Sequence, residues 1–253
     1  MRIHSLLAFL LAAGACAPAA ARAQTQADSL LRPGSAQVDG RVIPEGVESL
    51  MMYVDPGNRR MDASITLRTR LATVDGTEAI VRTETFWQGD EVVQVDSFVL
   101  HRETLAPLSR WSAGPQGLVR VEFVPGMART ARAGEWGRDS AEVPLPQPVF
   151  LAGTTDMLLG ALPLREGYSA RLAVYNVDEG VTSIDISVVG QEQVALPSGG
   201  RAAAWEVEVR EAGPPVTYWV DRESHTLVQY ASEGGVIRFV REPPGPQRRR
   251  ETR

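Results

Sequence analysis

Trp205-Glu206-Val207-Glu208-Val209-Arg210 alternates apolar and charged residues without a break. Successive side chains of a β-strand point to opposite faces, so the three apolar side chains share one face and the three charged ones share the other. A strand with one buried face and one solvated face is typical of an antiparallel sheet. This stretch therefore predicts a β fold.

The same period of two recurs along most of the chain. Glycine-containing turns such as Asp75-Gly76 and Gly234-Gly235 separate the segments, as tight hairpins require. We therefore predict an all-β, mainly antiparallel fold, built as a curved sheet or half-barrel. The further strands are expected at residues 65–71, 81–87, 92–100, 118–124, 171–177, 182–189, 216–220 and 236–240.

One helix is expected in the middle of the chain, at about residues 155–162. Thr154 or Thr155 can cap its N-terminus, Asp156 suits the positive end of a helix, and Pro163 stops it. We interpret this helix as a crossover between two β halves, at about residues 60–133 and 168–241.

The first 23 residues have the order of a secretory signal peptide. Arg2 precedes an apolar stretch at residues 6–15, and Ala21-Arg22-Ala23 is a small-x-small cleavage pattern. The apolar stretch is shorter than the roughly 20 residues that span a bilayer, and no other stretch qualifies. The sequence therefore predicts an exported protein, periplasmic or extracellular, whose mature chain has no transmembrane segment.

Cys16 supports a second interpretation of the same leader. It follows Ala13-Gly14-Ala15, whose small residues suit lipoprotein cleavage, although Ala13 stands where a bulky aliphatic residue is usual. Lipidation of Cys16 would anchor the domain to a membrane. Cleavage after Ala23 would instead leave a mature chain without cysteine.

The remaining chain is predicted to contain a flexible linker at residues 24–39, a single β-rich domain at 40–242 and a disordered basic tail at 243–253. Removal of residues 1–23 takes away Arg2 and Arg22 and no acid, so the net charge changes from −5 to −7. This acidic balance argues against a nucleic-acid partner.

Two short clusters resemble each other and contain chemistry-bearing residues: His101-Arg102-Glu103-Thr104 and Asp221-Arg222-Glu223-Ser224. Each follows an aromatic-aliphatic strand, so both are expected to be hairpin corners of similar geometry, with polar side chains bonded to the turn backbone. His101 and His225 lack the partner spacing of a metal site. We find no nucleophile or phosphate-loop signature, and we predict no catalytic residue, metal or cofactor.

Large aromatic side chains on the predicted strands offer a different kind of site. They can fill a core or line a ligand cavity, and a long sheet with few helices can leave a concave apolar face. The candidate ligand-binding residues are Trp87, Trp111, Trp205 and Trp219.

Several stretches resemble a bacterial exported family of unknown function, DUF3108. They are residues 150–168, Val174-Tyr175, residues 188–192, residues 218–223 and the corner His101-Arg102-Glu103-Thr104-Leu105-Ala106-Pro107, where the family usually has aspartate in place of His101. The likeness covers roughly residues 60–240. It implies a curved antiparallel sheet akin to that of LolA/LolB-type lipoprotein carriers, whose concave face holds acyl chains, and it implies no catalytic residues.

Three hypotheses on function follow. The first is an exported, non-enzymatic envelope protein that binds a lipid, acyl chain or other apolar ligand in a half-barrel. The second is a structural or protein-interaction module of the cell envelope with a filled core. The third is a hydrolase that uses dispersed carboxylates such as Asp156, Asp221 and Glu223.

Overall fold

The computed structural model describes residues 30–55, 58–135, 137–211 and 213–243, which form one large, mostly antiparallel 16-stranded sheet. The N-terminal half is a meander of β2 (Gly46–Val54), β3 (Arg59–Val74), β4 (Thr77–Gln88), β5 (Glu91–His101), β6 (Pro107–Gly114), β7 (Gly117–Val124), β8 (Met127–Gly134) and β9 (Gly137–Pro144). The C-terminal half is a second meander of β11 (Ser169–Asn176), β12 (Gly180–Ala195), β13 (Arg201–Arg210), β14 (Val216–Asp221), β15 (Leu227–Ser232) and β16 (Ile237–Glu242).

The two halves are joined by strands that lie far apart in the sequence. β16 pairs antiparallel with β2, from Ile237 opposite Val54 to Glu242 opposite Ser49. Two short strands, β1 (Leu30–Leu31) and β10 (Phe150–Leu151), pair in parallel with β11. The strand order ends at β9 and at β1, so the sheet is curved but not closed. The predicted fold class is confirmed.

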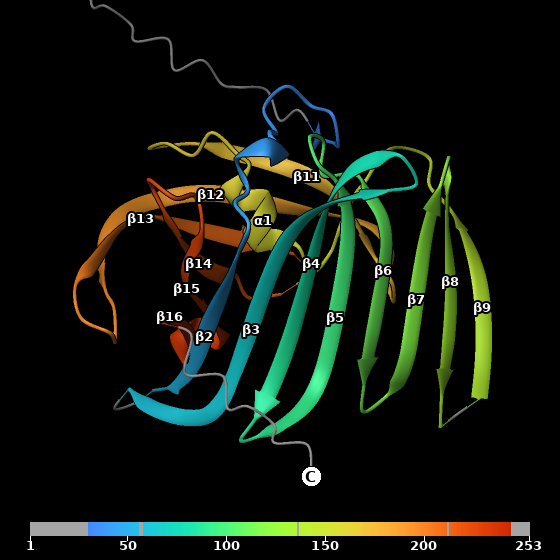
Figure 1. Cartoon of the computed structure of the whole chain (residues 1–253). Coiled ribbons are helices and arrows are strands. Elements are labelled where there is room, and N and C mark those ends of the chain that lie inside the picture. Colours follow the sequence, from blue (N-terminus) through green and yellow to red (C-terminus); the bar gives the residue numbers. More distant parts are fainter. Residues whose placement is uncertain (1–29, 56–57, 136, 212, 244–253) are drawn as a thin grey trace, which may run out of the picture.

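Within the part of the chain that the structure describes, one short α-helix, α1 (Thr155–Gly160), connects the halves as predicted. Figure 1 shows it between the strands of the two halves, in the upper part of the view. Thr154 precedes the helix but does not cap it with its side chain, because its Oγ1 donates to the Leu151 carbonyl at 2.7 Å. The Asp156 carboxylate was expected to favour the N-terminus of the helix, but it accepts a hydrogen bond from Arg82 of β4.

Apolar side chains on the concave side form the core. Met157, Leu158, Leu159 and Leu162 of the α1 region pack against inner-face residues such as Val207 of β13. A second cluster around Phe98 and Tyr175 packs β5 to β8 against β10 and β11. The alternating stretch at residues 205–210 packs as its pattern predicts, since Val207 and Val209 are buried. The α1 end of the half-barrel is therefore filled with side chains.

The outer face of β13 is less exposed to solvent than the alternation of its residues suggests. Ala202 and Ala204 are buried there, with Val194, Val228 and the partly buried Trp219 packed around them. β12 is long enough to place Val194 opposite Ala202, and Val228 of β15 and Trp219 of β14 complete this outer apolar cluster.

The prediction of a flexible linker up to residue 39 is wrong for residues 30–39. Leu30 and Leu31 add β1 to the sheet, and Leu31 and Val38 are buried. Asp39 bridges to the end of α1, where its N–H donates to the Ala161 carbonyl at 3.0 Å. The 3₁₀ helix η1 (Gly40–Val42) follows immediately. Residues 1–29, with the predicted signal peptide and Cys16, and residues 244–253 lie outside the described residues.

Candidate functional site

The four candidate tryptophans do not meet at one site. In the β13–β14 register Trp205 lies opposite Val220 and Trp219 opposite Glu206, so the two rings point to opposite faces of the sheet. Trp205 packs against the inner core under the Arg222 guanidinium, which lies 4.5 Å from the ring centroid. Trp219 is on the outer face, where its Nε1 donates to Glu192 at 2.9 Å.

The other two tryptophans also lie on the outer face. Trp87 donates from Nε1 to the Thr66 hydroxyl at 3.2 Å. Trp111 lies opposite Ser97, one residue out of phase with the buried Phe98, and is 38 % exposed. Only Trp205 therefore borders the interior, and the set cannot line a single cavity.

The two similar corners have the same backbone geometry, as predicted. Leu105 and His225, each four residues after the start of its corner, adopt φ angles of 55° and 58°. Their N–H groups donate to the carbonyls of His101 and Asp221, in both cases at 3.0 Å. The first side chain of each corner accepts from the turn backbone. Asp221 accepts from Glu223 and Ser224 at 3.0 and 2.8 Å, and His101 Nδ1 accepts from Glu103 and Thr104 at 3.3 Å.

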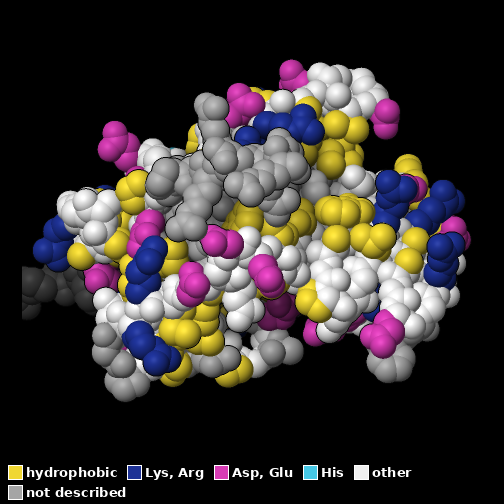
Figure 2. Space-filling view, turned by 60° about the horizontal axis from the view of Figure 1, so that its bottom comes forward, with side chains coloured by type: hydrophobic (Ala, Val, Ile, Leu, Met, Phe, Trp, Pro, Cys, Tyr) yellow, Lys and Arg dark blue, Asp and Glu magenta, His cyan; other side chains and the backbone are white. Residues whose placement is uncertain are grey.

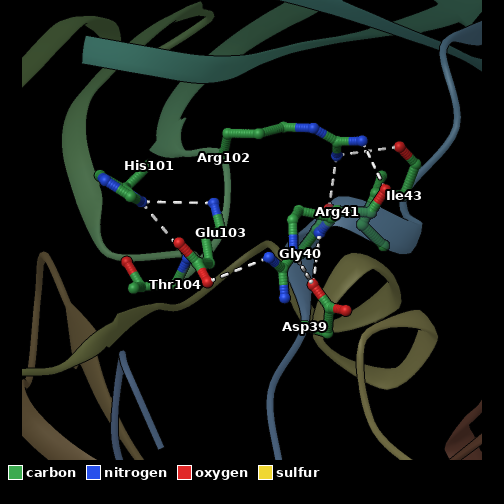
Figure 3. Close-up of polar contacts among 8 residues, drawn as sticks. All are labelled: Asp39, Gly40, Arg41, Ile43, His101, Arg102, Glu103 and Thr104. Carbon is green, nitrogen blue, oxygen red and sulfur yellow. Dashed lines mark hydrogen bonds and ion pairs between the residues drawn. The ribbon is translucent and has the colours of Figure 1, made fainter. Parts of the chain in front are cut away.

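Arg102 of the first corner holds the N-terminal segment (Figure 3). Its guanidinium donates to the carbonyls of Gly40, Arg41 and Ile43, at 2.5, 2.5 and 3.1 Å. These carbonyls belong to η1 and its C-cap, which have few other partners for their oxygens. The corner clusters are thus structural, and Asp221, a carboxylate of the hydrolase hypothesis, is occupied by its turn.

Replacement of His101 by aspartate should stabilise the protein by about 0.5–1 kcal/mol, because a charged acceptor forms stronger hydrogen bonds than a neutral imidazole nitrogen. Asp221 shows the shorter bonds that such a residue makes in the same turn. The free energy of unfolding at pH 7, measured in urea, checks this expectation. His101→Ala is the matched control and should be destabilising, while equal stability of H101D and wild type would contradict it.

A buried polar cluster lies on the inner face below α1. We use this name for Glu48 of β2, Thr69 of β3, Arg82 and Glu84 of β4, and Asp156 of α1. Arg82 is its centre, with a side chain only 4 % exposed. Its guanidinium donates to Asp156 at 2.5 Å and to the Thr69 hydroxyl at 2.7 Å, and its Nε lies 3.4 Å from Glu84. The sheet and α1 are therefore connected by a buried ion pair.

The buried polar cluster contains more carboxyl groups than guanidinium groups, and burial disfavours the ionised form of the carboxyl groups. Burial raises the pKa of Glu84 to about 8, with Asp156 adding to the rise and Arg82 opposing it. Burial also raises the pKa of Glu48, which is 3.8 Å from Arg241. Part of the Glu84 side chain, 23 %, remains accessible, and it faces a cavity rather than the outer surface.

Two adjacent cavities border this cluster. The first, of 180 Å³, is lined by Glu45, Glu48, Thr69, Arg82 and Asp156 together with apolar and corner residues. The second, of 190 Å³, is lined by Glu84, Thr155 and Asp156 together with apolar and tyrosine residues. Asp156 and Leu227 belong to the walls of both.

An aromatic wall continues from the second cavity along the inner face. We use this name for Phe86, Tyr218, Tyr230 and Phe239. Tyr218 and Tyr230 stack at 5.8 Å between ring centroids, and Tyr230 and Phe239 stack at 4.9 Å. Three of the four rings, those of Phe86, Tyr218 and Tyr230, are only partly buried, although Tyr218 also packs against the core cluster that contains α1. Figure 2 shows the molecule with the bottom of Figure 1 turned forward, and hydrophobic and acidic side chains lie beside one another on the surface in view.

Sequence reasoning missed this site, although β4 contains a signal for it. Arg82 and Glu84 are in phase with the inner-face residues Ile80 and Phe86, where a strand normally places apolar side chains. Ionisable residues at strand positions that point toward the core indicate a polar site in the interior. The partner on α1, Asp156, could not be found from the spacing within β4.

Glu84→Gln should change how stability depends on pH. The pKa of Glu84 is raised from 4.5 to about 8 in the folded chain, so the stability it contributes is fully present below pH 4.5 and is lost as the pH rises through about 8. Glutamine does not titrate, so the variant should gain stability relative to wild type from pH 5 to pH 9, on the order of a few kcal/mol. Urea unfolding at several pH values measures this difference. The exposed Glu91→Gln is the control, and parallel pH curves for E84Q and wild type would refute the expectation.

No group of three or more histidine, cysteine, aspartate or glutamate side chains in the described residues is arranged to hold a metal ion. Across the same residues, no helix has the length and apolarity needed to cross a bilayer.

The fold and the site define an open half-barrel whose α1 end is filled with side chains. Below α1 lie the two cavities, which we call the hollow, bordered by the buried polar cluster and by the aromatic wall. The chain belongs to the family described as protein of unknown function (DUF3108), whose family model matches residues 51–239. No curated protein matches the chain.

Two crystal structures are similar to this chain at low identity. A β-barrel-like protein of the DUF1849 family from Brucella abortus is 8 % identical, and the match covers 79 % of this chain and 96 % of that one with a TM-score of 0.47. A candidate lipoprotein from Parabacteroides distasonis is 10 % identical, with 82 % and 99 % covered and a TM-score of 0.28. At these values neither structure carries information about function or ligand.

Proposed function

We propose that this protein is an exported, non-enzymatic β protein that binds a slender apolar ligand, the alkyl or acyl chain of a lipid, against the aromatic wall. The observation that carries the proposal is the partly exposed aromatic wall, which continues the second cavity on the concave face. Rings in such a position offer apolar area to a ligand and would otherwise face water.

The size of the cavities limits the ligand. Pockets for drug-sized ligands have volumes of roughly 300–1,000 Å³, while a dry cavity of about 150 Å³ holds a molecule of the size of benzene. At 190 Å³ the second cavity accepts a short stretch of alkyl chain. The rest of a longer chain would lie along the aromatic wall, so a single slender chain fits better than a bulky ring system.

Non-enzymatic binding is favoured by how the carboxylates are used. Asp156 is paired with Arg82, and Asp221 accepts from its own turn. General acid–base chemistry needs two such groups converging on a reacting atom in one cleft. In this chain Asp156 and Asp221 serve different structural contacts.

The proposal is tested with octanol and the protein stripped of lipid. Isothermal titration should show saturable binding, and it should disappear in Ile65→Trp, because Ile65 lines the second cavity and an indole would fill it. Val189→Trp is the matched control, since Val189 is 51 % exposed and lies outside both cavities. Octanol binding that I65W and V189W share with wild type, or no binding at all, would reject the proposal.

A second candidate function is supported by the filled α1 end. The buried clusters around α1 and around Phe98 fill part of the concave face with side chains, as in a structural module that needs no ligand. In that case alkyl ligands leave the melting temperature unchanged, and cross-linking in the envelope identifies a protein partner instead.

Export and anchoring are proposals that rest on the leader. Cleavage after Ala23 leaves a free periplasmic or extracellular domain, and cleavage before Cys16 leaves a lipidated one. The intact mass of the mature protein distinguishes the two products.

A further inference from the structure

The ionisable side chains that line the two cavities are mostly acidic. Four of them are carboxylic acids, Glu45, Glu48, Glu84 and Asp156, against the single guanidinium of Arg82 and the imidazole of His225. A ligand that enters the hollow therefore meets an excess of carboxyl groups close to its polar end.

The nearby basic groups are already used by the chain. Arg82 is bound to Asp156 and Thr69. Arg241, the next arginine along the inner face, donates to Thr226 at 2.7 Å and lies within 4 Å of both Glu48 and Asp221. His225 donates from Nδ1 to the Gly160 carbonyl at 3.1 Å. Among the described residues that line the two cavities, the one guanidinium, that of Arg82, is already paired with Asp156, so an anionic head group would have to compete with this carboxylate.

The polar cluster is not saturated by its own contacts. Arg82 Nε is buried and has no hydrogen-bond acceptor among the described residues, although the side chain lines the first cavity. Glu84 approaches that atom only at 3.4 Å, and its carboxyl group faces the second cavity. A cation beside Glu84 would give this carboxyl the close partner that Arg82 does not provide, and would lower its raised pKa.

We propose that the ligand is an amphiphile with a cationic amine head, which pairs with Glu84 and Asp156 while its alkyl chain lies on the aromatic wall. This inference rests on the proposed function and names its ligand class. An ammonium group is small enough for the second cavity, where Glu84 and Asp156 both contribute to the wall. A fatty-acid carboxylate would be repelled by Asp156.

The test compares octylamine, octanol and octanoate, which share one chain and differ in head charge at pH 7. Isothermal titration of the lipid-free full chain should give octylamine at least ten-fold tighter binding than octanol, with octanoate the weakest. In Glu84→Gln the advantage of octylamine over octanol should fall to less than three-fold. Glu91→Gln makes the same substitution at an exposed site outside both cavities and should keep the full advantage.

The outcomes separate the two proposals. Octanol binding with no advantage for octylamine, or equal binding of octanoate, would overturn the amine head and leave the apolar site standing. An octylamine advantage that E84Q and E91Q both keep would also overturn it, because the preference would then come from overall charge. If none of the three compounds binds, the proposed function fails together with the inference.

Discussion

Replacing Arg82 with methionine should lower the free energy of unfolding by about 3–5 kcal/mol, the usual result of breaking a buried ion pair on one side. The variant leaves Asp156 without its guanidinium, although the Asp156 side chain is only 13 % exposed. It also removes the charge that opposes the pKa rise of Glu84. Urea unfolding at pH 7 measures the loss.

Two further variants identify the cause. Arg68→Met removes an exposed arginine from the neighbouring strand β3 and should change stability by no more than about 0.5 kcal/mol. The double variant R82M/D156L should recover much of the loss, because apolar residues often replace a buried pair at little cost. If R82M and R68M were equally stable, the pair would contribute nothing to holding α1 on the sheet.

Gly160→Ala should destabilise the protein by about 2–3 kcal/mol through overpacking, although alanine is normally favoured over glycine by about 1 kcal/mol inside a helix. A Cβ atom at this position would lie 2.4 Å from the His225 carbonyl oxygen and 3.2 Å from Ile43 Cδ1. The backbone of the second corner cannot yield without disturbing its hydrogen bonds. For a chain of this size, the melting temperature should fall by about 4–12 °C.

Gly46→Ala is the matched control for this substitution. Its added Cβ would meet no atom within 4 Å, and its φ angle is not positive, so the melting temperature should change little. A Gly160→Ala variant as stable as wild type would show that the corner moves freely away from α1. Gly40 has the same relation to the first corner, where a Cβ would lie 2.4 Å from the Arg102 carbonyl oxygen.

The parts of the fold that could be predicted are those in which local pattern and tertiary environment agree. β13 alternates because one face packs inward, and Asp75-Gly76 has positive φ at both residues, as its hairpin turn requires. The two corners were predicted to be similar because the same residue types meet the same backbone demands. In contrast, β2 contains the apolar run Leu50-Met51-Met52-Tyr53, and β9 is almost fully exposed, so neither shows a period of two.

The site depended on contacts that no local pattern contains. Residues 30–39 were predicted to be a linker from their polar composition, yet Leu31 and Val38 are buried, and Leu31 pairs with Leu172, more than a hundred residues away. The tryptophans were chosen for size, while the register of their strands places three of them on the outer face. Asp156 meets Arg82 only because the crossover brings α1 over β4.

The pairing of β16 with β2 also has a consequence for the order of events during synthesis. One long edge of β2 has no partner until residues 237–242 have emerged, nearly two hundred residues after β2 itself. At about 5–20 residues per second, this interval is on the order of ten seconds or more. During that time an unpaired strand edge is open to wrong partners, so the nascent chain should need a chaperone's protection, and loss of the last strand should make it aggregate rather than merely weaken it.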